Sequence, residues 1–374
     1  MAVPARPDCI IIRTRPRCRI RQENAVFPRV AILCGTAAGP RCGLQPAPQP
    51  TPRCSLKPAP RSPHEQWNGH ARLFRDGGPA SGCSGGQSRG TLCSGPPSPG
   101  TVGTSLMRWI IGDVHGMLKP LRTLLDAVLA ADPSPRFYFA GDYVNRGPDS
   151  RGVIDLLLEL PNARFIRGNH DDIFDLVLHG GGYADNAARG DRLAAFRWFL
   201  KHGLDDTFVS YGADWGDLER LGQCPTAEGL NRLVDLVPDE HKRFIHSLPP
   251  VIEEEDLFVG HGMWNPNEPA EFPGIAVRLE REPARRAELL WGRFDDHQLG
   301  RPKAWLRTGY FGHTPIDNYV AARRAREMLP IAGPSIVLLD TACALSPRGR
   351  LTAFCAEQQC LIQADHFGNL VEDR

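Results

Sequence analysis

The feature that most constrains the fold is an alternation of short apolar runs with segments of helical periodicity between residues 108 and 178. Apolar runs that are typical of buried strands occupy 108–112, 136–141 and 164–168. Between and after them, apolar residues recur at helical spacing over 117–131, 149–160 and 172–178. Because parallel strands need crossover connections that usually hold a helix, this βαβαβα order predicts an α/β fold with a parallel sheet.

The rest of the chain predicts a different arrangement. Residues 191–247 have a mostly helical pattern, and apolar runs then return at 257–260, 308–312, 335–339, 351–355 and 361–364. Little helical pattern separates the last three runs, so we expect a mixed, more antiparallel second half.

Polar residues of one kind follow five of these runs. The segments are Asp113-Val114-His115-Gly116, Gly141-Asp142, Gly168-Asn169-His170-Asp171, His261-Gly262 and Gly312-His313-Thr314. Because ligands of open α/β sheets bind outside the carboxyl ends of the strands, we expect these groups to converge. Carboxylate, amide and imidazole donors without thiolate suit Mn, Fe or Zn, and their number suits two ions that activate water against a phosphoryl group.

The first 106 residues have a composition that opposes a packed core. They contain 14 Lys/Arg against 4 Asp/Glu, together with 16 of the 34 prolines and 7 of the 11 cysteines. We therefore expect residues 1–106 to form a disordered basic extension and residues 107–374 to form the folded domain. Met107 directly precedes the first strand, so translation from Met107 is an alternative.

Composition also limits the expected partners and location. The chain has 44 Lys/Arg against 43 Asp/Glu and no apolar stretch near the ~20 residues that span a bilayer, so we expect neither a nucleic-acid partner nor a membrane. Its dispersed cysteines lack paired C-x-x-C spacing, which favours a reducing, cytoplasmic location without structural zinc. A targeting or interaction role for the basic extension is the alternative, and nothing indicates an oligomeric state.

Five motifs together resemble a known family. GDVHG (112–116), GDYVNRG (141–147), RGNHD (167–171), HG (261–262) and FGHTP (311–315) resemble the signature set of the phosphoprotein phosphatase (PPP) family of metallophosphoesterases, and most of all its bacterial serine/threonine protein phosphatase-like branch. Segments 198–212, 289–294 and 338–354 stand in the order seen in that branch, so the resemblance covers nearly all of residues 107–374. It implies a four-layered α/β/β/α sandwich of the calcineurin-like metallophosphoesterase type.

The resemblance also implies a set of metal ligands and catalytic groups. It makes Asp113 and His115 ligands of a first ion, Asp142 the bridge, and Asn169, His261 and His313 ligands of a second. The two divalent ions are expected to be Mn²⁺, with Fe or Zn as alternatives. His170 resembles the general acid that protonates the leaving alkoxide, and Arg146, Arg167 and Arg293 resemble phosphate clamps. A metal-bridging hydroxide would attack phosphorus in line, without a phosphoenzyme.

One member of the expected catalytic set departs from the family pattern. Asn145 stands where the family usually has an Asp; an amide carries no charge, so the pKa of the general-acid histidine should fall.

We expect an enzyme that hydrolyses phosphate monoesters, with phosphoserine or phosphothreonine in proteins as the favoured substrate and a small phosphorylated molecule as another possible partner. Symmetrical diadenosine tetraphosphate hydrolases also lack that Asp and read GNHD, so they are the first alternative. A phosphate-binding module with weakened catalysis is the second.

Overall fold

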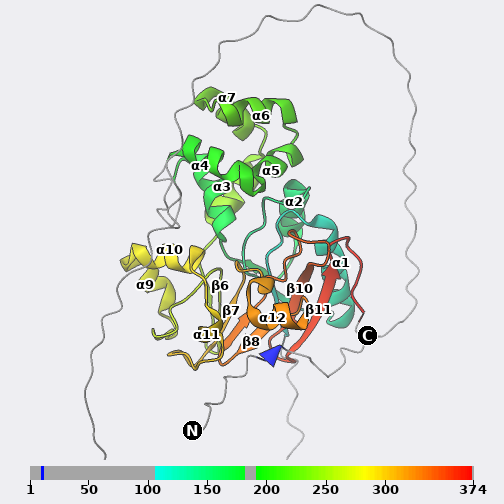
Figure 1. Ribbon diagram of the computed structural model, residues 1–374, viewed down its shortest axis with the longest axis vertical. Helices are drawn as coiled ribbons and strands as arrows, with labels where there is room; N and C mark the ends of the chain where they lie inside the picture. Colours follow the sequence, from blue (N-terminus) through cyan, green and yellow to red (C-terminus); the bar gives the residue numbers. More distant parts are fainter. Residues whose placement is uncertain (1–9, 12–105, 182–190, 373–374) are drawn as a thin grey trace, which may run out of the picture. The chain divides into compact units, whose positions relative to one another are not determined.

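Two β-sheets form the centre of the chain in the computed structural model, which describes residues 10–11, 106–181 and 191–372 (Figure 1). The first sheet has the strand order β11-β10-β2-β3-β4. Its strands are β2 (Arg108–Ile111), β3 (Arg136–Phe139), β4 (Ala163–Phe165), β10 (Arg350–Cys355) and β11 (Cys360–Asp365). Strands β2, β3 and β4 are parallel, whereas β10 and β11 are antiparallel additions. The predicted βαβαβ beginning is confirmed.

The second sheet is mixed, with the order β1-β8-β9-β7-β6-β5. Its strands are β1 (Ile10–Ile11), β5 (Ile252–Glu253), β6 (Leu257–Gly260), β7 (Thr308–Phe311), β8 (Ile331–Gly333) and β9 (Ile336–Leu338). Strands β6, β7 and β9 are parallel, and the outer strands run antiparallel to their neighbours. Of the first 106 residues only Ile10, Ile11 and Leu106 are described, so the prediction of a disordered extension lies outside the described residues.

Helices follow the first three strands and fill a long insertion. The crossover helices are α1 (Leu118–Ala131), α2 (Ser150–Glu159) and α3 (Asn169–His179). Between α3 and β5 lie α4 (Arg192–Phe199), a kinked turn (Leu200–Leu204), α5 (Asp205–Ser210), α6 (Trp215–Gln223), α7 (Ala227–Val234) and α8 (Asp239–Ser247). Around the second sheet lie α9 (Ile275–Arg281), α10 (Pro283–Trp291), α11 (Asp296–Leu299), a 3-10 turn (Ile316–Asn318) and α12 (Val320–Ala325). None of the described helices is long and apolar enough to cross a membrane.

Three hydrophobic clusters define the layers. Because successive side chains of a strand point to opposite faces, β2 sends Trp109 and Ile111 toward the cluster under α1 and α2, and Ile110 toward the other sheet. Ile110 shares that middle cluster with Val259 of β6 and Val337 of β9, which packs the two sheets face to face. A third cluster lies between the second sheet and α9 to α11. The predicted four-layered α/β/β/α sandwich is therefore confirmed.

Candidate metal centre

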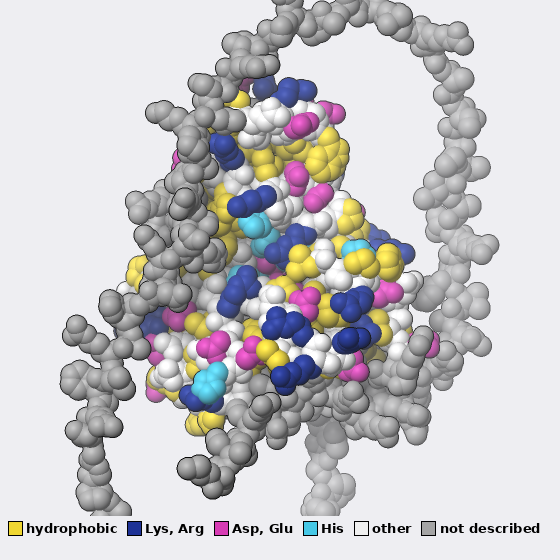
Figure 2. Space-filling view, viewed as in Figure 1, with side chains coloured by type: hydrophobic (Ala, Val, Ile, Leu, Met, Phe, Trp, Pro, Cys, Tyr) yellow, Lys and Arg dark blue, Asp and Glu magenta, His cyan; other side chains and the backbone are white. Residues whose placement is uncertain are grey.

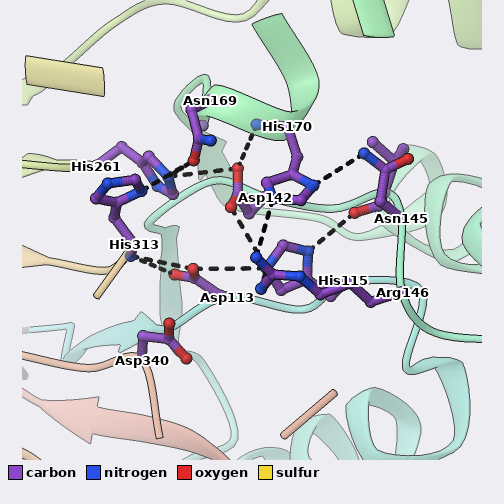
Figure 3. A network of polar contacts seen from close by, with 12 residues as sticks. Asp113, His115, Asp142, Asn145, Arg146, Asn169, His170, His261, His313 and Asp340 are labelled. Atoms are coloured by element: carbon purple, nitrogen blue, oxygen red, sulfur yellow. Dashed lines mark hydrogen bonds and ion pairs between the residues drawn. The ribbon is translucent and has the colours of Figure 1, made fainter. Parts of the chain in front are cut away.

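The carboxyl ends of strands from both sheets meet at one buried cluster (Figure 3). Asp113 follows β2, Asp142 follows β3 and Asn169 begins α3 just after β4. From the second sheet, His261 follows β6 and His313 follows β7. All five side chains are buried. The sequence rule that gathered them at strand ends thus predicted a real neighbourhood, although the residues lie up to 200 positions apart.

The backbone at these strand ends bends sharply. His115, Asp142 and His313 have positive φ angles of 48°, 55° and 66°, and Asn145 and Arg146 have φ angles of 73° and 67°. Residues other than glycine adopt this left-handed region at a cost of about 1–3 kcal/mol each, and such strain concentrates at functional sites. The bends turn side chains that would otherwise alternate across a sheet toward one shared space.

Asp142 lies at the centre of the cluster. Its Oδ2 is 3.4 Å from Nε2 of His115, and its Oδ1 is 3.3 Å from Nε2 of His261. Oδ1 also accepts a hydrogen bond of 2.9 Å from the backbone N–H of His170. The two oxygens of one carboxylate therefore face two groups of donors, as the bridging role predicted for Asp142 requires.

The Asp171 carboxylate fixes the backbone around Asp142 by hydrogen bonds. It accepts hydrogen bonds of 2.8–2.9 Å from the backbone N–H groups of Asp142, Tyr143 and Gly168. These bonds join the loop after β3 to the start of α3, so they position Asp142 beside Asn169. Burial and the nearby charge of Asp142 raise the pKa of Asp171 to about 7.

Three imidazoles have one ring nitrogen within hydrogen-bond distance of a backbone carbonyl. The pairs are His115 Nδ1 with Val144 at 2.9 Å, His261 Nδ1 with Ala140 at 2.7 Å, and His313 Nε2 with Trp291 at 3.2 Å. Because a carbonyl only accepts, that nitrogen must carry the proton, and the other nitrogen of a neutral ring faces the cluster with a lone pair. Histidines that bind metal ions are oriented in this way.

The ligand atoms inside the cluster lie within hydrogen-bond distance of one another. Oδ1 of Asn169 lies 2.9 Å from both His261 Nε2 and His313 Nδ1. Although burial opposes it, Asp142 raises the pKa of His261 to about 9, so Nε2 of His261 carries a proton and can donate it to Asn169 Oδ1. Burial and the neighbouring Asp340 raise the pKa of Asp113 well above its ordinary value. This donor set fits divalent cations, which would replace that proton.

Two triads of potential ligands share Asp142. Within each triad the ligand atoms lie within 4.8 Å of one another. The triads are His115, Asp142 and His170, and Asp113, Asp142 and His261. Burial and the charge of Arg146 lower the pKa of His115 to about 3, so its ring is neutral and able to bind an ion. Asp113 groups with His261 in these triads, and its Oδ2 lies 3.8 Å from Nε2 of His115, so the triads share the predicted bridge but not the predicted division of the other ligands.

His170 lies at the rim of the cluster, between Asn145 and Arg146. Its Nδ1 is 2.9 Å from the Asn145 amide, and its Nε2 is 3.0 Å from a guanidinium nitrogen of Arg146. The Asn145 amide is held in turn by the Thr207 hydroxyl, which donates to Oδ1 at 2.8 Å. Burial lowers the pKa of His170 well below its ordinary value, and the uncharged Asn145 does nothing to oppose this.

The three predicted arginine clamps have different positions. Arg146 reaches the cluster, with a guanidinium nitrogen 2.6 Å from His115 Nε2. Arg293 is exposed beside it and donates to the Thr314 hydroxyl at 3.1 Å. Arg167 does not lie in the cluster. Its buried guanidinium pairs with Asp172 and Asp175 and donates to backbone carbonyls at the end of α8. The prediction that Arg167 clamps phosphate is therefore wrong. Its guanidinium instead links α3 to α8 by hydrogen bonds and ion pairs.

Sequence reasoning missed Asp340 as a member of the site. Asp340 follows β9, is 2% exposed, and has a carboxylate oxygen, Oδ2, without a hydrogen-bond partner among the described residues. The sequence did contain a signal for Asp340, because this residue follows an apolar run in the same way as the five residue groups that were recognised.

Sequence reasoning also missed Gly203. It has a φ of 86°, and a Cβ there would lie 2.2 Å from the backbone nitrogen of Arg146, so only glycine fits.

Comparisons with known proteins agree with this geometry. Residues 108–292 match the family model described as calcineurin-like phosphoesterase. Among curated proteins, a symmetrical bis(5'-nucleosyl)-tetraphosphatase of Marinomonas sp. (strain MWYL1) is 38% identical over 87 residues, which are 23% of this chain and 30% of that protein. A protein of the same name from Bordetella pertussis is 45% identical over 65 residues, or 17% of this chain and 24% of that protein. The chain thus spans less than a third of the length of these relatives.

Solved structures show more distant similarity. A putative diadenosine tetraphosphatase has a TM-score of 0.41 and 23% identity, with 70% of this chain and 94% of that chain covered. A serine/threonine phosphatase from Saccharomyces cerevisiae has a TM-score of 0.39 and 14% identity, with 72% and 81% covered.

Proposed function

Because residues 108–292 match the calcineurin-like phosphoesterase family model, we propose that the chain hydrolyses phosphate ester or phosphoanhydride bonds at the buried cluster where its two sheets meet. One observation carries the proposal: three histidines each turn a ring nitrogen toward oxygen ligands while a backbone carbonyl holds the other nitrogen. Histidines that bind metal ions usually donate their other ring N–H to a backbone carbonyl or carboxylate, as these three do.

Six side chains would hold the ions. Asp113, His115 and Asp142 would hold the first, and Asp142, Asn169, His261 and His313 the second, with Mn²⁺ as the favoured metal. A bound pair of divalent ions lowers the pKa of water and neutralises charge that develops on the phosphoryl oxygens.

The remaining groups act on the substrate directly. The guanidinium of Arg146 lies between His115 and His170, so it is placed to hold phosphoryl oxygens over the cluster. His170 would give a proton from Nε2 to the leaving oxygen, although this nitrogen accepts a hydrogen bond from the Arg146 guanidinium in the structure. Arg293, exposed next to His313, would bind an outer phosphate oxygen.

A groove of about 590 Å³ beside Arg146 indicates the substrate class. Its lining includes the cations Lys119 and Arg122 and the aromatic ring of Phe367, all exposed. Neither cation has an ion pair with another described residue. Figure 2 shows basic side chains on the face that carries α1 and α12, with histidine and hydrophobic side chains among them. Cations beside an aromatic ring complement the phosphates and the base of a nucleotide.

We therefore propose a dinucleoside tetraphosphate as the substrate, with one nucleotide in the groove. The curated relatives are named symmetrical tetraphosphatases, which supports this choice. Phosphoserine or phosphothreonine in a protein is the second candidate, and the motif order over residues 198–212, 289–294 and 338–354 favours it. A reducing, cytoplasmic location stays a prediction.

A comparison of substrates tests this proposal. With Mn²⁺, we expect the full chain to convert diadenosine tetraphosphate to ADP with kcat/KM at least about tenfold higher than for a phosphothreonine peptide, because only the nucleotide fills the groove. Arg122→Ala should raise KM for the dinucleotide several-fold and leave KM for p-nitrophenyl phosphate unchanged. Arg232→Ala, an exposed arginine of α7, is the matched control. A preference for the peptide would favour the second candidate, and inactivity of the metal-loaded protein on all three compounds would contradict hydrolysis.

Asn145→Asp is expected to extend activity to higher pH. The new carboxylate would lie about where the amide now lies, 2.9 Å from Nδ1 of His170, and an opposite charge at that distance raises a pKa by about 1–3 units. A general acid works only while it carries its proton, so activity falls as pH rises through its pKa. A raised pKa therefore moves the alkaline limit of kcat upward.

The measurement for Asn145→Asp is the pH profile of kcat on a phosphothreonine peptide between pH 5 and 10. We expect a gain of roughly tenfold at pH 8. The profile on p-nitrophenyl phosphate serves as the control, since its leaving group needs little protonation. Superimposable profiles of the two proteins on the peptide would contradict a charge effect at this position.

A further inference from the structure

A second group of potential metal ligands lies away from the cluster just described. Asp175 and His179 are one helical turn apart on α3, and His246 is in the last turn of α8. Oδ1 of Asp175 is 2.7 Å from Nδ1 of His179 and 3.1 Å from Nδ1 of His246. The three ligand atoms lie within 4.8 Å of one another. Two imidazoles on different helices therefore converge on one carboxylate oxygen.

The group is closed on one side and open on the other. The side chain of Asp175 is 3% exposed, whereas those of His179 and His246 are 34% and 65% exposed. An ion could therefore reach the ring nitrogens from solvent while the carboxylate stays fixed. The two rings lie 4.9 Å apart between centroids, close enough to share one ion.

Charges on the buried side favour a cation. Oδ2 of Asp175 accepts a hydrogen bond of 2.8 Å from Arg167, which leaves Oδ1 for the two histidines. Arg167 also pairs with the buried Asp172 at 3.0 Å. The carboxylates of Asp172 and Asp175 together carry one more negative charge than the Arg167 guanidinium compensates. A net negative charge therefore lies next to the two imidazoles. The two interactions of Arg167 also fix the orientation of the Asp175 carboxylate, as second partners of metal ligands do.

We propose that Asp175, His179 and His246 form a separate binding site for a divalent transition-metal ion such as Zn²⁺. Two imidazoles and a carboxylate suit Zn²⁺, and water would complete a tetrahedral coordination. In that geometry neighbouring ligand atoms are about 3.4 Å apart. Asp175 Oδ1 now lies 2.7 Å from His179 Nδ1 and 3.1 Å from His246 Nδ1, so these atoms need to separate by less than about 1 Å. The ion would displace the protons that now join the histidine Nδ1 atoms to Asp175.

Such an ion would join α3 to α8. His179 is the last residue of α3, about 15 Å along the helix from Asn169 at its start. Asn169 and His170 belong to the cluster between the sheets, so the site would stabilise the helix that presents them. The proposal depends only on Asp175, His179, His246 and their neighbours, and does not require the proposed hydrolysis.

The test uses full-length protein stripped with a chelator and dialysed against Zn²⁺. We expect the double variant His179→Asn, His246→Asn to bind one Zn²⁺ fewer per chain than the wild type, as measured by atomic absorption. His297→Asn, an exposed histidine of α11, is the matched control and should bind as many ions as the wild type. Zinc bound by the cluster between the sheets or by the cysteines of residues 1–106 contributes equally to all three proteins.

A second measurement on the unaltered protein keeps the proposal testable if the double variant does not fold. Diethyl pyrocarbonate modifies an imidazole nitrogen that has a free lone pair. Zn²⁺ should therefore protect His179 and His246 at least fivefold, while His297 reacts as before, by peptide mass spectrometry. Equal zinc content in wild type and double variant, or unprotected His179 and His246 at saturating Zn²⁺, would overturn the proposal.

Discussion

Replacing His170 with Asn is expected to lower kcat on a phosphothreonine peptide by about 10²–10⁴-fold. The same change should lower kcat on p-nitrophenyl phosphate by less than about tenfold. The difference arises because the alkoxide of threonine is a strongly basic leaving group that needs a proton, whereas p-nitrophenolate leaves readily without one. His170 is placed for this task because it lies at the rim of the cluster, next to the Arg146 guanidinium that is proposed to hold the phosphoryl oxygens.

Two controls separate proton donation from other roles of His170. His202→Asn changes a half-buried histidine whose ring lies 6.4 Å from that of His170. This control should lower kcat on both esters much less than His170→Asn does. Metal content must be measured as well, because His170 shares a triad with His115 and Asp142. An equal loss on both esters, with metal content unchanged, would show that His170 does not act as the general acid.

The cluster could be predicted because strand ends obey a simple geometric rule. Asp113, Asp142 and Asn169 follow consecutive parallel strands of one sheet, and such ends meet at one edge. His261 and His313 follow parallel strands of the other sheet. The sandwich architecture brings these two edges to the same space. The alternation of apolar and helical segments does not predict how the two sheets are placed, whereas the family resemblance implied it.

Arg167 shows what a motif does not determine. It stands directly before GNHD, next to residues of the cluster, but its side chain points to α8. The carbonyl groups at the C-terminal end of α8 attract a cation, and Asp172 and Asp175 on α3 complete its partners. Those groups come from elements up to about 80 residues away in sequence, so their convergence could not be deduced from local pattern.

Sequence reasoning missed the helices α9 and α10 and some short strands. Strands β5 and β8 contain two and three residues, too few for a period to be recognised. Glu253 of β5 lies in the acidic run 253–256, a composition typical of solvated turns, but Arg307 pairs with it at 3.1 Å. Neighbouring Glu254 and Asp256 pair with Arg108. Ion pairs between distant segments thus determined structure that local polarity did not indicate.

The second large effect is expected at Asp142, the residue whose two oxygens face both halves of the cluster. Oδ2 lies near His115 and Oδ1 near His261, so a cation on either side would contact a different oxygen of the same carboxylate. Although burial opposes it, the positive charge of His261 holds the pKa of Asp142 well below its ordinary value. Asp142 is therefore ionised across the working pH range, and a neutral replacement removes a full negative charge.

Asp142→Asn should accordingly lower kcat by at least about a hundredfold, since loss of a partner behind a metal ligand already costs about 10–100-fold. The amide keeps the size of the side chain, which matters because a Cβ on Gly168 would lie only 2.1 Å from Oδ1, so the backbone approaches this carboxylate closely. Metal content should fall below two ions per cluster, and added Mn²⁺ should restore only part of the activity. Asp126→Asn, an exposed residue of α1, is the matched control. Full metal content with activity within tenfold of the wild type would show that Asp142 is not the bridge, and that the two donor groups hold their ions independently.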